Sequence, residues 1–142
     1  MTLYKISDER LESTTFQQVG VLERQGLQPL LRANIEIVVP DALVLAEEFS
    51  NWEDSRRRID LLALESQARL VVIELKRTED GGHMELQSLR YAAMISNLTF
   101  DQAVTAHADY LGGARGDSNA RQAVLDFLGW EEEREGEFAQ DV

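Results

Sequence analysis

RIDLLALESQARLVVIELK, residues 58–76, is the stretch of sequence that decides the fold. Two apolar runs flank a short polar segment, a pattern that predicts two antiparallel strands joined by a turn. If the turn lets Glu65 pair with Arg69, counting back along both strands places Asp60 opposite Glu74. Directly opposed residues have β-carbons about 5 Å apart. The two carboxylates are therefore expected to share one small patch of sheet.

The end of this stretch adds a positive charge to the two carboxylates. Side chains alternate between the faces of a strand, so Glu74 and Lys76 point the same way and Leu75 points the opposite way. Mg²⁺ prefers oxygen ligands and keeps several waters, so one or two carboxylates suffice to bind it. The sequence therefore predicts a site for Mg²⁺ or Mn²⁺ held by Asp60, Glu74 and the backbone carbonyl of Leu75. Lys76 is expected to orient the attacking water or to stabilise charge on a scissile phosphate.

The residues before the motif strengthen this interpretation. Residues 70–73, LVVI, form a continuous apolar run that is typical of a strand buried on both faces. Charged groups directly after such a run cost free energy unless they are paired or bind a ligand. Lys76 is also one of only two lysines, whereas twelve basic residues are arginines. A lysine here favours chemistry that needs a compact point charge.

The composition is that of one globular domain. The chain has 142 residues, 44% of them hydrophobic, and no cysteine, which suits a reducing cytoplasm. No apolar run reaches the length needed to cross a membrane. The net charge is −12, but residues 56–77 carry six basic and three acidic residues. Residues 131–142 carry six acids and one base, which predicts a domain over residues 1–130 followed by an acidic tail or linker.

The remaining segments predict helices around a sheet. Expected elements are a short strand at 2–6, an irregular or partly helical connection at 7–20, a strand at 42–49 and helices at 21–32, 84–96, 99–111 and 118–128. Pro29 is expected to kink or end the first helix early. His83 and His107 lack the spacing of metal ligands and are expected at the surface. The fold class is therefore α/β, with a core hairpin flanked by helices.

The pattern Asp60, Glu74-Leu75-Lys76 resembles the PD-(D/E)XK nuclease superfamily. The segments RRIDLLALE, RLVVIELKR and LQSLRYAAMIS look most like its RecB-like and NucS-like branch. The resemblance covers about residues 15–111 and implies a restriction-endonuclease-like fold, with a central mixed sheet and an α-β-β-β-α-β core. It also implies metal-dependent hydrolysis of phosphodiester bonds in DNA. Ile59 stands where the strict motif has proline.

The resemblance implies two further site residues. An acid on the first helix completes such sites, and Glu23 matches that position. A glutamine on the helix after the motif recurs in the family, and Gln87 matches it, with Tyr91 one turn later. Gln87 also lies in a helical stripe with Met84, Tyr91 and Met94 that is expected to face the sheet. Glu23 and Gln87 are thus two polar side chains aimed at one buried sheet, and buried polar groups require a partner there.

Arginines near the motif are candidate contacts to nucleic acid. Alternation sends Arg56 and Arg58 toward the site and Arg57 away from it. Arg77 follows the motif directly, and Tyr91 completes the candidate surface. Arg56, Arg57 and Arg58 could instead be solvated charges at the start of a strand, but the alternation slightly favours a clamp for phosphate.

Several alternatives stay open at this stage. The acids and the lysine could form solvated cross-strand ion pairs, and the domain could be a non-catalytic module that binds nucleic acid or protein on a nuclease scaffold. A dimerisation domain is a third reading. No segment after residue 99 has the pattern of a buried strand, so the last core strand, and a further C-terminal domain, are expected beyond residue 142. The resemblance implies a homodimer, but the sequence alone does not give the oligomeric state. It also does not show whether the substrate is DNA or RNA.

Overall fold

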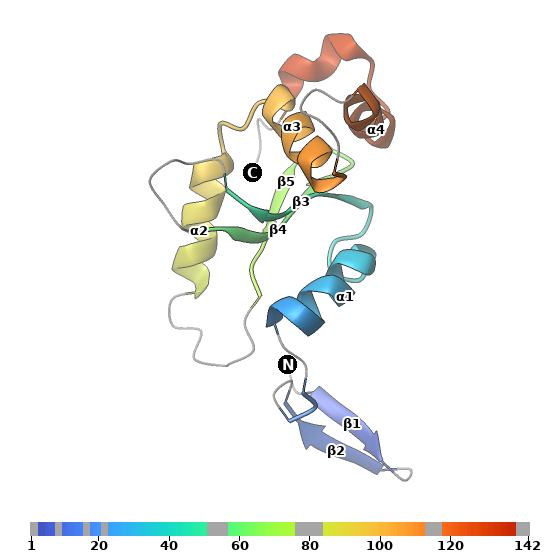
Figure 1. Ribbon diagram of the computed structural model, residues 1–142, viewed down its shortest axis with the longest axis vertical. Helices are drawn as coiled ribbons and strands as arrows, with labels where there is room; N and C mark the ends of the chain where they lie inside the picture. The colour runs from blue at the N-terminus through green and yellow to red at the C-terminus, as the bar shows by residue number, and fades with distance from the viewer. Residues whose placement is uncertain are drawn as a thin grey trace.

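The computed structural model describes residues 3–7, 10–15, 18–20, 23–50, 57–75, 84–112 and 118–138 (Figure 1). The strands are β1 Leu3–Ser7, β2 Arg10–Thr14, β3 Ala42–Phe49, β4 Ile59–Glu65 and β5 Leu70–Ile73. The α-helices are α1 Gln28–Ala33, α2 Met84–Ile95, α3 Phe100–Tyr110 and α4 Ser118–Leu128. A π-helical turn, Glu23–Leu27, precedes α1, and short 3-10 helices span Ile35–Ile37 and Glu132–Glu137. The chain is therefore α/β, as the sequence predicts.

The core hairpin has the predicted register. In the antiparallel pair β4–β5, Leu61 lies opposite Ile73, and the N–H of Glu65 donates to the carbonyl of Arg69 at 2.9 Å. Ala68 closes the turn at φ 62°, a left-handed conformation. Continuing this register by one residue places Asp60 opposite Glu74.

The sheet itself differs from the predicted mixed sheet. Its strand order is β3-β4-β5, and both pairs are antiparallel. Each strand follows the previous one by a short connection, which suits antiparallel pairing because parallel strands need a long crossover. Within residues 99–112 and 118–138 the structure contains helices and no strand, as expected.

Helices cover both faces of this sheet. In Figure 1, α2 (yellow) and α1 (blue) lie on opposite sides of it, and α3 and α4 lie together beyond β3. Leu62 and Leu64 of β4 belong to the core formed with α2, α3 and α4. Leu61 and Ala63, the alternate residues, pack with residues of the first helical segment. The central strand is buried on both faces because its sequence is apolar at every position from 61 to 64.

The later helices form where the sequence predicts them, but the N-terminal region differs. Thr99 caps α3 through a capping box with Gln102, which explains where that helix begins. The predicted helix at 21–32 is instead a π-helical turn followed by α1. Pro29 lies in the first turn of α1, where its missing N–H costs nothing. Residues 10–14, expected to be irregular or partly helical, instead pair with β1 as a separate two-stranded hairpin.

His107 is buried, and its predicted place at the surface was wrong. Only 3% of the residue is exposed, and Nδ1 lies 3.3 Å from the carbonyl oxygen of Leu45, to which it donates. The ring stacks on Tyr110. Burial lowers the pKa of His107 below its ordinary value, because a charged imidazole loses hydration inside the core.

Stability is therefore expected to fall as the pH drops below the unfolded pKa of about 6.5. In that range the unfolded imidazole binds a proton that the folded one excludes, so protonation favours unfolding. Melting temperatures measured between pH 7.5 and 5.5 should show this decline, and His107→Gln should flatten it. An equal decline in both proteins would contradict the assignment.

Candidate active site

Asp60 and Glu74 lie together at one end of the central hairpin. Asp60 is in β4, and Glu74 directly follows β5 in the paired position. The N–H of Leu75 donates to Oδ2 of Asp60 at 2.8 Å, which ties the end of β5 to the carboxylate on β4. Both acids are half-buried. The predicted neighbourhood of the two carboxylates is therefore present.

Glu74 is also held from the neighbouring helix. Nε2 of Gln87 on α2 donates to Oε1 of Glu74 at 2.6 Å and lies 3.3 Å from the hydroxyl of Tyr91. Tyr91 is one helical turn after Gln87, and its ring is buried against the sheet. The predicted partner for the polar side chain of Gln87 is thus the carboxylate of Glu74. A glutamine amide donates in a fixed direction, so this contact orients Glu74.

The sheet-facing stripe of α2 differs from the prediction in one place. Met94 is 40% exposed, and Ile95 is buried in its stead. Tyr91 and Ile95 are four residues apart, so they lie on the same side of the helix. Of the predicted stripe, the spacing of four residues between Gln87 and Tyr91 identified the side of α2 that faces the sheet.

Several predicted residues are only partly placed. Glu23 opens the π-helical turn, and its side chain lies outside what the structure describes. Lys76, Arg56 and Arg77 also lie outside the described residues. Arg58 is exposed just before β4.

Arg57 was predicted to point away from the site, and this stays a prediction. It lines a hollow together with Gln87 and Tyr91. The strand begins at Ile59, so residues 57 and 58 lack the regular alternation on which the prediction depended.

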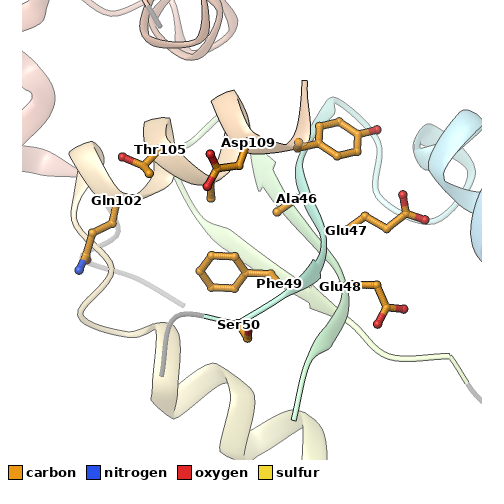
Figure 2. Close-up of a pocket in the computed structure, with 10 residues that line it drawn as sticks. Ala46, Glu47, Glu48, Phe49, Ser50, Gln102, Thr105 and Asp109 are labelled. Atoms are coloured by element: carbon orange, nitrogen blue, oxygen red, sulfur yellow. The ribbon is translucent and has the colours of Figure 1, made fainter. Parts of the chain in front are cut away.

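A third acid that sequence reasoning missed lies across the sheet from Asp60. Glu47 pairs with Leu61 and Phe49 pairs with Ile59, so Glu48 is opposite Asp60. The backbone of Glu48 is left-handed, at φ 52°. Such a conformation is uncommon for a residue other than glycine within a strand. Figure 2 shows Glu47 and Glu48 both pointing away from Phe49.

Gln28 on α1 connects to this acidic pair. Its Nε2 donates to Oε1 of Glu47 at 2.9 Å and to Oε1 of Glu48 at 3.3 Å. Only 3% of Gln28 is exposed. Arg32, one turn later, forms a 2.7 Å ion pair with Glu47, and this pair raises the pKa of Arg32. The signal for these residues was the pair of acids ending the apolar run of β3, the same pattern that revealed Glu74.

The donor set can be compared with what Mg²⁺ requires. In the part of the chain that the structure describes, no three Asp, Glu, His or Cys residues gather closely enough to hold a metal ion. Two carboxylates on neighbouring strands, with the peptide group of Leu75 fixed beside Asp60, remain a donor set that suits Mg²⁺, because this ion keeps several waters. The residues present fit a two-carboxylate site.

A larger hollow lies next to the acidic pair of β3. It has a volume of about 500 Å³ and is formed between β3 and α3 (Figure 2). Phe49, Thr105 and Asp109 line it together with Glu47 and Glu48. Neither Asp60 nor Glu74 lines this hollow, but Glu48, which lies opposite Asp60, does.

Comparisons with known proteins do not extend this picture. No protein-family model, curated protein or solved structure matches the chain. Among the described residues, no helix is long and apolar enough to cross a membrane.

Proposed function

We propose that this protein is a metal-dependent nuclease that hydrolyses phosphodiester bonds in DNA, on the scaffold of the PD-(D/E)XK superfamily that its motif resembles. The observation that supports this most is the pairing of Asp60 with Glu74, with Gln87 and Tyr91 behind Glu74. Asp60 and Glu74 are half-buried carboxylates, and burying charged groups costs free energy unless they are paired or bind a ligand. A ligand-binding role accounts for them.

Each residue then has a role. Asp60, Glu74 and the carbonyl of Leu75 would hold Mg²⁺ or Mn²⁺, which supplies an activated water and neutralises charge on the phosphate. Gln87 fixes the orientation of Glu74 by its 2.6 Å hydrogen bond. Lys76 is proposed to orient the water through its ammonium group. Glu23 is proposed to complete the site from the first helical segment.

The acidic balance of the chain favours a second candidate. With a net charge of −12, the protein has few cations with which to bind a polyanion non-specifically. A non-catalytic module on the same scaffold would have the same hairpin. Calorimetry separates the two functions, because tight DNA binding without metal uptake or cleavage supports the module. A cytoplasmic location, a homodimer and a further C-terminal domain remain predictions.

The proposed nuclease is tested with single-stranded, double-stranded and branched DNA, and with RNA, in Mg²⁺, in Mn²⁺ and in EDTA. Cleavage is expected only with metal. Lys76→Ala is expected to lower the rate about 100-fold or more, because a positioned charge or proton-transfer group contributes about that factor.

The other lysine, Lys5 on the exposed β1, provides a matched control. Lys5→Ala removes the same charge from the whole protein and should leave the rate unchanged. Equal activity of the two variants would remove Lys76 from the mechanism, and cleavage that persists in EDTA would reject a metal-dependent nuclease.

A further inference from the structure

The N-terminal hairpin lies apart from the rest of the molecule. Among the described strands, β1 and β2 pair with each other and form a sheet that is separate from β3-β4-β5. Figure 1 shows this hairpin below α1, away from the three-stranded sheet and from α2, α3 and α4. A two-stranded hairpin by itself is only marginally stable in water. The hairpin therefore gains stability from any further strand that pairs with it.

The hairpin has one charged face and one face with large apolar side chains. Tyr4 is 56% exposed and Leu11 is 69% exposed. Directly opposed residues share a face of a sheet, and so do residues two apart along one strand. The register of the hairpin therefore places Tyr4, Leu11 and Ser13 on one face and Lys5, Arg10 and Glu12 on the other.

Both strands of this small sheet are edge strands. An edge strand presents a row of unpaired backbone N–H and C=O groups, with which a strand of another chain can pair. Two copies of one chain that are related by a two-fold axis can pair the same strand with itself, in the antiparallel direction. In such a pair one residue lies opposite itself, and the charges beside it decide whether the pairing is favourable.

The charges of β2 favour one such pairing. With Leu11 opposite itself, Arg10 of each copy lies opposite Glu12 of the other copy, so two attractive charge pairs form. With Glu12 opposite itself, two carboxylates would repel each other. No hydrogen bond or ion pair joins the side chain of Arg10 or Glu12 to another described residue, so both are available. The strand β1 contains Lys5 and no acid, so it gains no such pair.

We propose that β2 pairs with β2 of a second copy of this chain, about a two-fold axis at Leu11, and forms a four-stranded antiparallel sheet. On the charged face, Lys5, Glu12 and Arg10 of the second copy form a row of alternating charge. On the other face, Tyr4 and Leu11 of both copies lie together. Five-residue strands bury less area than stable complexes do, so the dimer forms reversibly. This inference does not depend on the proposed function.

The position of the two-fold axis is tested by cross-linking. The chain contains no cysteine, so one introduced thiol reports on its own position. Leu11→Cys is expected to form a disulfide-linked dimer under mild oxidation, because opposed β-carbons lie about 4.5–5.5 Å apart, close to the separation that a disulfide needs. Pairing raises the effective concentration of the two thiols, so this dimer should form about tenfold faster than random collision allows.

Ser13→Cys is the matched control for the cross-link. Ser13 is exposed on the same strand and the same face as Leu11. It lies two residues from the axis, so the two copies of position 13 are about 13 Å apart along the strand and should cross-link only by collision. Both cysteine variants retain Arg10 and Glu12. If Leu11→Cys cross-links no faster than Ser13→Cys, the proposed pairing is rejected.

Charge reversal tests the same register without cross-linking. Arg10→Glu and Glu12→Arg each turn two attractions into two repulsions, so the Kd of self-association should rise about tenfold in each variant. An equimolar mixture of the two variants should associate as the parent protein does, because positions 10 and 12 again meet opposite charges. Sedimentation equilibrium over a range of protein concentrations measures all three samples.

The outcomes of the reversal experiment separate this interface from any other. Recovery of the dimer in the mixture supports the pairing of β2 with itself, because a contact elsewhere on the molecule would not respond to these charges. Equal association of the parent and of both variants alone would place the contact on another surface and overturn the proposal. A parent protein that stays monomeric at all concentrations would also overturn it.

Discussion

Asp60→Asn and Glu74→Gln are each expected to lower the rate of DNA cleavage by about 10³-fold or more. Each change replaces a carboxylate by an amide of the same shape, which binds a divalent cation poorly. A bound metal contributes several kcal/mol to stabilising the transition state, and each 1.4 kcal/mol corresponds to a factor of ten. Single-turnover rates with excess enzyme measure the change directly.

Both variants should fold as the parent protein does. An asparagine oxygen can still accept from the N–H of Leu75, and a glutamine at position 74 can still accept from Nε2 of Gln87. Glu65→Gln is the control, because Glu65 lies on the same hairpin at its other end and pairs with Arg69. Retained cleavage in Glu74→Gln, with an unchanged melting temperature, would refute the proposed metal site.

Phe138→Ala is expected to lower the free energy of unfolding by about 3 kcal/mol. Phe138 is 7% exposed and packs edge-to-face on Phe100, with ring centroids 5.5 Å apart. Removing the ring leaves a cavity and loses the aromatic contact. Urea unfolding measured by circular dichroism gives this quantity.

This substitution also tests the predicted domain boundary at residue 130. Leu111→Ala is the control, because Leu111 is a large apolar residue that is exposed; its effect should stay within about 0.5 kcal/mol. A large effect of Phe138→Ala would place residues 131–138 within the folded domain, where Arg121 also pairs with Glu135. If the two variants unfold alike, the boundary at residue 130 stands.

The core hairpin could be predicted because its determinants are local. The apolar runs fix the two strands, the turn fixes their register, and Asp60 then falls opposite Glu74 without further information. Gln87 could be placed on the sheet-facing side of its helix for the same reason, since helical spacing depends only on sequence separation. The proline in the first turn of α1 shows the limit, because a proline is compatible with a helix start as well as with a kink.

The rest depended on contacts between distant parts of the chain. Burial of His107 follows from the packing of α3 on β3, which brings Leu45 to its ring. The place of Arg57 follows from where β4 begins relative to α2. Gln28 meets Glu47 only because α1 lies against the sheet. Neither local propensity nor periodicity carries this information.

Two opposing requirements act on position 48, because its backbone is left-handed and its side chain is hydrogen-bonded. Glycine would relieve about 1 kcal/mol of steric cost there, but it would delete the carboxylate that the amide of Gln28 contacts. Directed evolution for heat resistance and directed evolution for turnover are thus expected to diverge at this position. Which amino acid a library retains under each regime would reveal whether the acid serves the architecture or the chemistry.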